Sequence, residues 1–430
     1  MSSDIYRIHQ KEKNNILTMS WLNSILVYLF LFYPLVGYIS RSRYGIWPAQ
    51  ILMVLTLPLF VLNNPIKFKF SHSLKYLALF VLYVAAQLII LGKSAAVADY
   101  KSFLTMLFLY LILANTNISK ALMKDIQSIS LFIIISATLV IAYQYLVNPL
   151  FLFNYIDYDV RDILIRRPMS YFGWSGTVSG GYSMPAFSAI VISEALKSNK
   201  KTKAIIVYVV GVIFSILCLS RYVMLSMLIV GSLFYLHTPE KRAFISKGAS
   251  FLAYTMIVIV LVLMASSAIG VNMSDIVQNR VFEGGEEFEN TSAYTRVFAF
   301  ELFNQVFWEK PIFGTGGRQT EQLADLRAGR TSQIHVGWLS LFFYFGVVGA
   351  FFYIMFTVNL LKELYVTAQN TNFWGSYVAF LTYFFSVMTT GVYFDISVAG
   401  YVVAFAVHCH YKRTSRAAAV MVKPDTAVAA

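Results

Sequence analysis

His335 stands at the start of a long apolar run, in TSQIHVGWLSLFFYFGVVGAFFYIMF (residues 331–356). Polar residues precede this histidine, and the run that follows it is almost wholly apolar. At a helix N-terminus the helix dipole disfavours a charged imidazole, and the nearby arginines act in the same direction. A neutral imidazole is what a general base needs near neutral pH. We therefore predict a base at a membrane surface; the alternative is an interfacial histidine with only a structural hydrogen bond.

Arg221 interrupts an apolar stretch of 33 residues between Lys203 and His237. One helix of that length would extend about 50 Å, which is too long for a single bilayer crossing. Since both flanks are basic, the sequence predicts a hairpin with its apex near Arg221, close to the outer interface. A buried arginine is costly unless it is paired, so Arg221 is a candidate functional residue. Structural pairing with a loop carboxylate is the alternative.

The composition indicates that membrane helices position these residues. Of the 430 residues, 58% are hydrophobic and only 13% are charged, unlike a soluble domain. Runs long enough to cross about 30 Å of hydrocarbon recur along the chain. We predict an all-α polytopic membrane protein with a single transmembrane domain over residues 1–430. The predicted spans number about twelve and lie near 21–39, 45–62, 74–92, 103–116, 128–147, 180–196, 204–219, 222–237, 249–270, 336–361, 374–392 and 395–411.

Lysine and arginine are sorted between two alternating sets of loops. The set that includes both termini holds sixteen lysines and four arginines, and the other set holds three lysines and eleven arginines. The positive-inside rule places the lysine-rich set in the cytoplasm, and the first run is predicted to be an uncleaved helix. Arginine's planar fork binds phosphate oxygens through paired bonds, which favours a phosphorylated ligand on the outer face. Anchoring in lipid headgroups is the alternative, and it is preferred for Arg41 and Arg43.

Two long hydrophilic loops are predicted on the outer side. Residues 148–179 interleave aromatic residues with Arg166 and Arg167, a mixture that suits sugar stacking and equally suits an aromatic belt. Residues 271–335 contain Arg280, then a predicted amphipathic helix that is capped at Ser292 and ends before Pro311, with Arg296 in its first turn. Arg318 follows in a basic segment. These arginines are the candidate diphosphate-binding residues.

Other signals are weaker and predict structure rather than chemistry. Gly346 and Gly349 are interpreted as helix-packing positions. Cys218 and Cys409 lie in apolar runs and predict neither a disulfide nor a zinc site. In HCH, residues 408–410, neighbouring positions on a helix point apart. We expect no metal and no cofactor.

The order of several landmarks resembles the O-antigen ligase/O-antigen polymerase superfamily of bacterial inner-membrane glycosyltransferases. The landmarks are GTVSGGYS before a helix, LSRYVML at the hairpin, RVFAFELFNQVFWEKPIFGTGG in the large loop, and HVGWLSLFFYFGVVGAFF. The resemblance covers roughly residues 173–361. It implies that His335, Arg221 and Arg296 are the functional set. One departure is Val336, where the family usually has asparagine after the histidine.

The resemblance implies a reaction on the periplasmic face of the bacterial inner membrane. The donor would be a saccharide on polyprenyl diphosphate, and His335 would deprotonate an acceptor sugar hydroxyl that attacks with inversion. Arg221 and Arg296 would stabilise the departing diphosphate. Expected partners are the lipid-linked oligosaccharide and membrane lipids, with a chain-length regulator and a flippase as candidates and no nucleic acid.

We predict a polymerase of O-antigen or a related surface polysaccharide, whose acceptor is another lipid-linked repeat chain. Three alternatives to this prediction stay open. An O-antigen ligase would transfer the glycan to lipid A-core instead of another repeat chain, and Val336 favours the polymerase slightly. A lipid-linked oligosaccharide flippase has a similar number of spans. Ion-coupled carriers, however, place ionisable residues within their spans, where this chain has almost none. A membrane protein without chemistry would leave the outer arginines unexplained.

Overall fold

The computed structural model describes the helical framework of the chain. The described residues are 24–25, 27–28, 31–32, 71–91, 94–115, 118–152, 170, 179–218, 221–237, 297, 299–301, 303–304, 307–316, 337–389 and 399–421. Their regular structure is helical, without strands, which confirms the all-α prediction for this part of the chain. Three of the described helices are long and apolar enough to cross a membrane. The predicted spans 45–62 and 249–270 lie outside the described residues, so the total of about twelve stays a prediction.

The helices follow the apolar runs, and several of them extend beyond the predicted bounds. They are α3 (His72–Leu91), α4 (Ser94–Asn115), α5 (Lys120–Leu146), α7 (Ser179–Lys197), α8 (Lys201–Leu217), α9 (Arg221–Gly231), α10 (Leu233–Leu236), the 3-10 turn η5 (Phe307–Glu309), α15 (Gly337–Thr371), α16 (Gly375–Thr389) and α17 (Ala399–Met421). The predicted span 103–116 starts too late, because SAAVADYK before it is also helical. Alanine favours helix whether or not lipid surrounds it, whereas hydropathy marks only the apolar part. Helix α5 also begins before its apolar run, because its polar first turn is capped by the Ser119 side chain.

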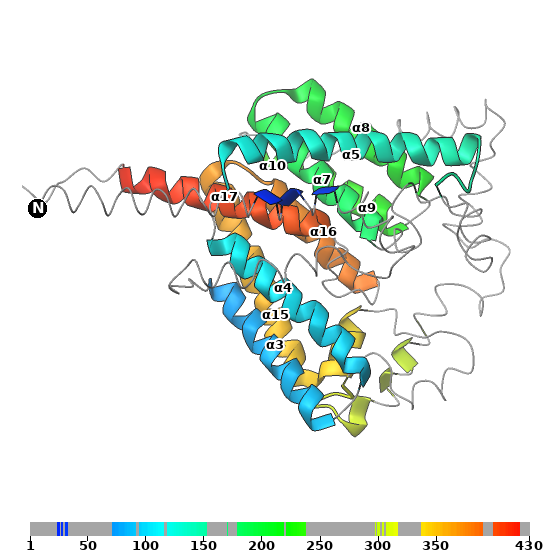
Figure 1. Cartoon of the computed structure of the whole chain (residues 1–430), viewed down its shortest axis with the longest axis vertical. Helices are drawn as coiled ribbons and strands as arrows, with labels where there is room; N and C mark the ends of the chain where they lie inside the picture. The colour runs from blue at the N-terminus through cyan, green and yellow to red at the C-terminus, as the bar shows by residue number, and fades with distance from the viewer. Residues whose placement is uncertain are drawn as a thin grey trace, which may run out of the picture.

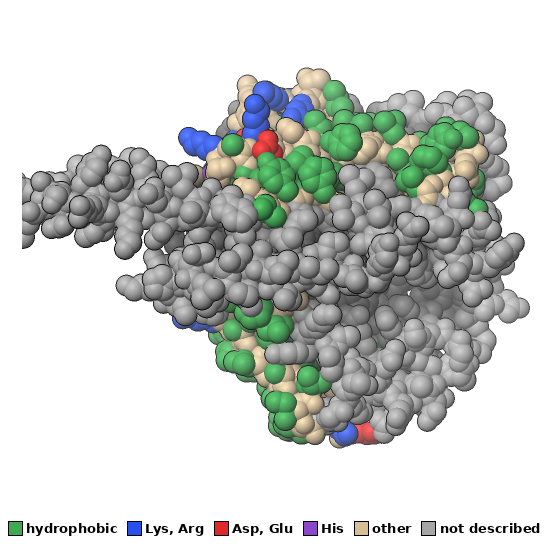
Figure 2. All heavy atoms as spheres, in the orientation of Figure 1, with side chains coloured by type: hydrophobic (Ala, Val, Ile, Leu, Met, Phe, Trp, Pro, Cys, Tyr) green, Lys and Arg blue, Asp and Glu red, His purple; other side chains and the backbone are tan. Residues whose placement is uncertain are grey.

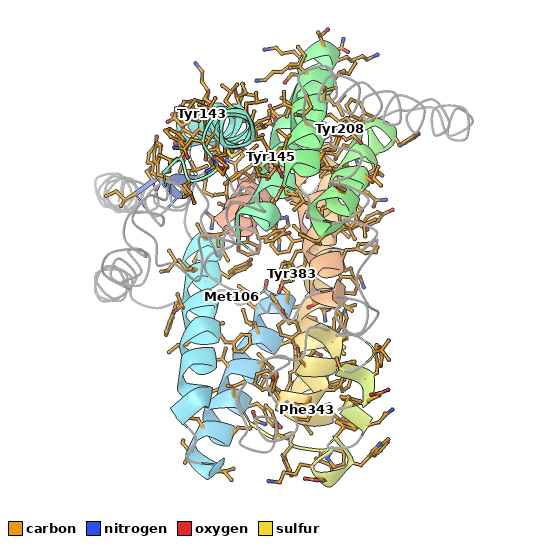
Figure 3. The ribbon with its side chains drawn as sticks, turned by 90° about the vertical axis from the view of Figure 1, so that its right-hand side faces the viewer. Met106, Tyr143, Tyr145, Tyr208, Phe343 and Tyr383 are labelled. Atoms are coloured by element: carbon orange, nitrogen blue, oxygen red, sulfur yellow. The ribbon has the colours of Figure 1, made fainter. Side chains whose placement is uncertain are left out.

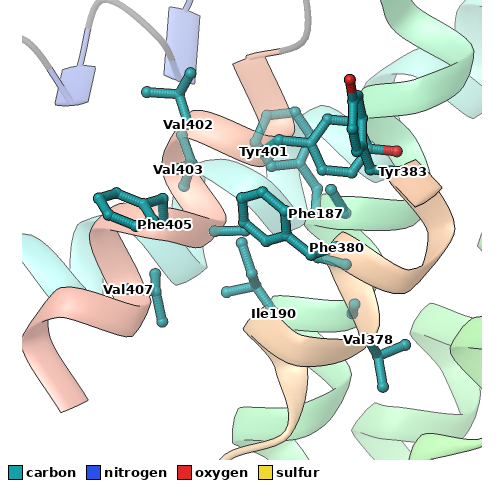
Figure 4. Packing of buried hydrophobic residues seen from close by; sticks show 14 of the residues in the cluster. Phe187, Ile190, Val378, Phe380, Tyr383, Tyr401, Val402, Val403, Phe405 and Val407 are labelled. Atoms are coloured by element: carbon teal, nitrogen blue, oxygen red, sulfur yellow. The ribbon is translucent and has the colours of Figure 1, made fainter. Parts of the chain in front are cut away.

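Two groups of helices meet through aromatic cores. In Figure 1, α5 and α7–α10 form an upper group, while α3, α4 and α15 lie below. In the lower group the Phe80 ring packs edge-on against Phe103, Phe345 and Tyr353, with centroids 4.8, 5.2 and 5.2 Å away. Figure 4 shows the core where Phe187 of α7, Phe380 of α16 and Tyr401 of α17 come together. Such close packing of large side chains fixes the helices against one another.

The predicted cytoplasmic loops come together at one end of the bundle, which we call the lysine end. There Glu363 of α15 accepts from Nζ of Lys412 on α17 at 2.7 Å and from the backbone N–H of Ser73 in the first turn of α3 at 3.1 Å. The Tyr411 hydroxyl likewise donates to Glu194 of α7 at 2.6 Å. These contacts agree with the predicted sorting of the loops.

The surface agrees with a helix bundle whose sides face lipid. Figure 2 shows lysine and arginine side chains gathered near the start of α5, with hydrophobic side chains spread along the helices beside them. On α5 the exposed residues include Phe132, Leu139 and Leu146. Exposed apolar side chains along the length of a helix are what a lipid environment permits and water does not.

Helix α15 is broken at Gly346, where the backbone has φ 63° and ψ −173°. The break takes the amides of Val347 and Val348 out of the helical pattern, and they donate instead to the carbonyl oxygens of Pro311 and Ile312 at 2.9 and 3.3 Å. In return, the amides of Thr315 and Gly316 donate to the carbonyl oxygens of Phe343 and Tyr344 at 3.0 and 2.9 Å. We call residues 311–316 the cap loop, because they pair with backbone groups on both sides of the break.

The break corrects the prediction that Gly346 is only a helix-packing position. A Cβ on Gly346 would lie 2.5 Å from the Gly314 amide nitrogen and even closer to Ile312 backbone atoms. Gly314 also has a positive φ of 72°, and its own Cβ would collide with the backbone of Gly346 and Tyr344. Glycine is therefore required at both positions for close backbone approach. Gly349 does pack as predicted, since a Cβ there would lie 2.7 Å from the Tyr83 ring.

We expect Gly346→Ala to destabilise the protein by about 2 kcal/mol or more, because it combines a positive φ with a clash against backbone that cannot move aside. The measurement is thermal unfolding of purified protein in detergent. Gly211→Ala is the matched control: the nearest atom there is the terminal methyl of Met227, at 2.5 Å, which can rotate away. Equal melting temperatures for Gly346→Ala and the wild type would contradict the broken geometry.

Candidate functional site

Arg221 is the first residue of α9, so the structure places it at the start of the second arm of the predicted hairpin. The neighbouring residue, Tyr222, fixes this turn. Its hydroxyl donates to the carbonyl oxygen of Thr382 on α16 at 3.2 Å and lies 3.1 Å from the Tyr401 hydroxyl on α17. A buried hydroxyl needs such partners in an apolar core. The start of α9 is thereby held against α16 and α17.

In the sequence, His335 lies two residues before Gly337, the first residue of α15. The first turn of α15 is closed by Ser340, whose hydroxyl donates to the Gly337 carbonyl oxygen at 3.0 Å. Trp338 packs against Phe384 of α16, with ring centroids 5.2 Å apart. The start of α15 therefore also lies against α16.

The two helix starts converge on the same turn of α16. Tyr222, next to Arg221, bonds Thr382, while Trp338, three residues after His335, packs on Phe384. Thr382 and Phe384 are two residues apart, so their Cα atoms are separated by only one turn or less. Figure 3 shows Tyr383, the residue between them, where the upper and lower groups meet. The starts of α9 and α15 thus contact neighbouring residues of α16, while the side chain of Arg221 and the whole of His335 lie outside the described residues.

The predicted amphipathic helix forms the arm that leads from Arg296 to the cap loop. The described residues 297, 299–301 and 303–304 are helical, as predicted. Ala299 is buried, and the Phe303 ring stacks on Phe307 of η5 with centroids 4.5 Å apart. The other side of the arm exposes Val297 and Phe300. An arm that packs inward and still presents apolar residues outward suits a membrane interface.

The turn η5 and the cap loop also present apolar side chains to their surroundings. Trp308 of η5 is 71% exposed and Phe313 of the cap loop is 64% exposed. Val347, at the break, is sixteen residues along α15 from Glu363 at the lysine end (363 − 347), a rise of about 24 Å. That rise is close to the hydrocarbon thickness of about 30 Å, so the break lies near the membrane boundary opposite the lysine end. Aromatic residues such as Trp308 are typical of this boundary.

The first predicted outer loop is anchored by a buried amide. Gln144, near the end of α5, accepts from the backbone N–H of Ser170 at 2.7 Å and donates to the Phe151 carbonyl oxygen at 2.9 Å. The Ser170 hydroxyl donates to the carbonyl oxygen of Ala137 at 2.8 Å. Ser170 is three residues after Arg167, so these bonds fix the chain close to both candidate arginines of this loop.

Of the seven predicted site residues, only Arg221 has a described backbone, and its side chain is not described. His335, Arg296, Arg166, Arg167, Arg280 and Arg318 lie outside the described residues, so their roles stay predictions. Sequence reasoning missed Gln87, Gln144 and Tyr222, which organise the surrounding backbone. The available signal was an uncharged polar side chain, an amide or a hydroxyl, within an apolar span, since each such group needs a hydrogen-bond partner.

The described residues contain no group of three or more His, Cys, Asp or Glu side chains that could hold a metal ion. In the HCH segment, Nδ1 of His410 lies 2.8 Å from the Ile118 carbonyl oxygen, between α4 and α5. Cys218 and Cys409 are buried. These side chains take part in packing at the lysine end and along the helices.

The fold and the site framework define a helical membrane protein with a large loop docked onto a broken helix. Residues 206–354 match the family model described as O-antigen ligase. This match confirms the resemblance to the O-antigen ligase/O-antigen polymerase superfamily and supports a ligase- or polymerase-type function. It includes Arg221, Arg280, Arg296, Arg318 and His335. No curated relative matches the chain.

We expect Tyr222→Phe to lower the stability of the protein by about 1–3 kcal/mol, because the Thr382 carbonyl oxygen and the Tyr401 hydroxyl lose a buried partner. Thermal unfolding in detergent measures the change. Tyr365→Phe is the control, since it removes a hydroxyl from an exposed side chain that only accepts from Gln369. Unfolding temperatures that fall equally in both variants would argue against the role of Tyr222 at the start of α9.

Proposed function

We propose that the protein polymerises a surface polysaccharide such as O-antigen by moving glycan from polyprenyl diphosphate to an acceptor sugar hydroxyl. The reaction would take place on the periplasmic side of the bacterial inner membrane. The family match across residues 206–354 supports a glycosyltransferase of the ligase or polymerase type. The observation that supports the assignment to this site is that the start of α9, whose first residue is Arg221, and the start of α15, two residues after His335, both contact residues 382–384 of α16.

The proposed step is an inverting displacement. His335 accepts the proton of the acceptor hydroxyl, and the oxygen forms a bond to the anomeric carbon of the donor sugar. The bond from that carbon to the diphosphate oxygen breaks, and the electron pair leaves with polyprenyl diphosphate. Arg221 and Arg296 stabilise the negative charge that develops on this leaving group. Diphosphate is already a good leaving group, so the proposal needs neither a metal nor a general acid.

The further arginines Arg166, Arg167, Arg280 and Arg318 are proposed to bind the diphosphate or the glycan. Arg166 and Arg167 lie just before Ser170, whose backbone is held by Gln144, and a fixed chain preorganises charged side chains for an anion. Arg318 lies two residues after the cap loop. A chain-length regulator and a flippase are proposed partners, since polymer length and donor supply lie outside this step.

The acceptor distinguishes the proposed polymerase from the second candidate, an O-antigen ligase. The family model carries the ligase description, and the chemistry at the donor is the same in both cases. Purified protein in liposomes, given lipid-linked repeat units alone, would lengthen the chains if it is a polymerase. Product that forms only after lipid A-core is added would establish the ligase instead.

We expect His335→Ala to reduce transfer by about 10²–10⁴-fold, because no base remains to take the acceptor proton. The assay is chain elongation by purified protein in liposomes, with thermal unfolding as the control for correct folding. Wild-type chain length in this variant would remove the base role. It would also reopen the flippase alternative, in which lipid-linked glycan crosses the bilayer without lengthening.

We expect Arg221→Lys to reduce transfer by about 10²-fold or more, because one ammonium cannot replace the paired bonds of the guanidinium to a diphosphate. The elongation assay measures the loss. Arg41→Lys is the matched control, since that arginine is predicted to anchor in lipid headgroups, where lysine serves equally well. Full activity of Arg221→Lys would indicate that Arg221 is also only an anchor.

A further inference from the structure

Two polar side chains of α3 reach the break in α15. The Tyr83 hydroxyl lies 2.9 Å from the Phe313 carbonyl oxygen of the cap loop and 2.8 Å from the Phe345 carbonyl oxygen of α15. Nε2 of Gln87 donates to the Phe313 carbonyl oxygen and lies 3.3 Å from the Tyr344 carbonyl oxygen. The two N–H groups of Gln87 can therefore bridge the cap loop and the outer half of α15, while the single hydroxyl hydrogen of Tyr83 is shared between a carbonyl oxygen on each side. Gln87 also bonds Tyr83, at 3.3 Å, which links the two bridges.

These bridges complete the pairing that the backbone alone leaves unfinished. The cap loop supplies amides to Phe343 and Tyr344, but the Phe345 carbonyl oxygen at the break receives its donor from Tyr83. Gln87 is 5% exposed and lies among apolar residues, where an amide is costly unless it is bonded. Both of its closest backbone neighbours are carbonyl oxygens, which fixes the orientation of the amide with its N–H groups toward them.

The junction joins the two chain segments that carry the proposed functional residues. One segment runs from Val297, next to Arg296, to the cap loop, and the other runs from Gly337, two residues after His335, to the break. Residues 337–346 rise about 14 Å as helix, and the described residues 297, 299–301 and 303–304 of the other segment are helical too. A rotation or slip at the junction would move the far ends of both segments.

We propose that Tyr83 and Gln87 are positioning residues of the transfer reaction. By bonding the cap loop to the outer half of α15, they set the separation between Arg296, which stabilises the leaving diphosphate, and His335, which takes the acceptor proton. This inference rests on the proposed function. Neither side chain touches the reacting atoms. Their loss lowers the turnover of correctly folded protein, because catalysis depends on placement to within a fraction of an ångström.

The first test compares Tyr83→Phe and Gln87→Leu with the wild type in the liposome elongation assay. We expect kcat per folded molecule to fall about 10-fold or more, with the KM for lipid-linked donor changed much less, because placement rather than binding is lost. Tyr76→Phe is the matched control: it removes a hydroxyl from α3 about two turns nearer the lysine end. That variant is expected to keep the wild-type kcat.

A second variant separates positioning from simple stabilisation. Gln87→Glu can donate to one of the two carbonyl oxygens only while the introduced carboxyl is protonated, and it keeps no donor once it ionises. The ratio of variant to wild-type kcat should therefore be highest at low pH and fall as the pH rises and the carboxyl ionises. Thermal unfolding across the same pH range checks that the protein stays folded at the assay temperature.

The outcomes distinguish this inference from the proposed function. Elongation by the wild type that depends on His335, together with full kcat in Tyr83→Phe and Gln87→Leu, would overturn the positioning role alone. A loss that appears only as less folded protein, with kcat per folded molecule intact, would overturn it as well. If the wild type does not transfer glycan at all, or if His335→Ala is as active as the wild type, the proposed function itself fails.

Discussion

The described structure depends most on one constraint, which is that backbone polar groups in an apolar medium must find partners. Helix α15 interrupts its own pattern at Gly346, and the groups released there are paired with the cap loop and with α3. A break of this kind is tolerated within a membrane protein only where protein surrounds it. The cap loop is therefore an integral part of the bundle, since its backbone groups pair with those released at the break in α15.

At the lysine end, side-chain contacts hold the helices together directly. There side chains link α3, α15 and α17 through Glu363, and α7 and α17 through Glu194. The ion pair is half-buried and has a backbone amide as a third partner, so it is better satisfied than a surface pair. The starts of α9 and α15 meet α16 away from these contacts, at residues 382 and 384.

Sequence patterns predicted the elements better than the connections between them. The hairpin at Arg221 followed from length alone, because 33 apolar residues cannot cross a bilayer once. The amphipathic arm after Arg296 followed from its spacing, and the described residues of that arm are helical. The break at Gly346 could not be predicted in the same way, since the apolar run continues through it. What stabilises the break comes from α3 and from the cap loop, which are more than 250 and about 30 residues away.

The same reasoning explains which parts of the site were accessible to prediction. Charge and helix-start position mark His335 and Arg221 as candidates without any knowledge of packing. Gln87, Gln144 and Tyr222 act by bonding distant backbone carbonyl groups or amides, and a sequence does not show which carbonyl lies nearby. Hydropathy treats such residues as mild interruptions of a span. Their importance comes from the tertiary structure, where the cost of an unpaired polar group is high.

The pairing of the cap loop with α15 has a consequence for how this fold can diverge. Most of its bonds join main-chain atoms, so the pairing itself does not depend on the side chains at most positions of 311–316 and 343–348. Gly314 and Gly346 are the exceptions, since their backbones touch, and Phe343, Tyr344 and Phe345 are held by burial in the core. Homologues could therefore differ widely at the exposed positions of this junction and retain its shape. In such homologues, two glycines about thirty positions apart would be the remaining sequence sign of this junction.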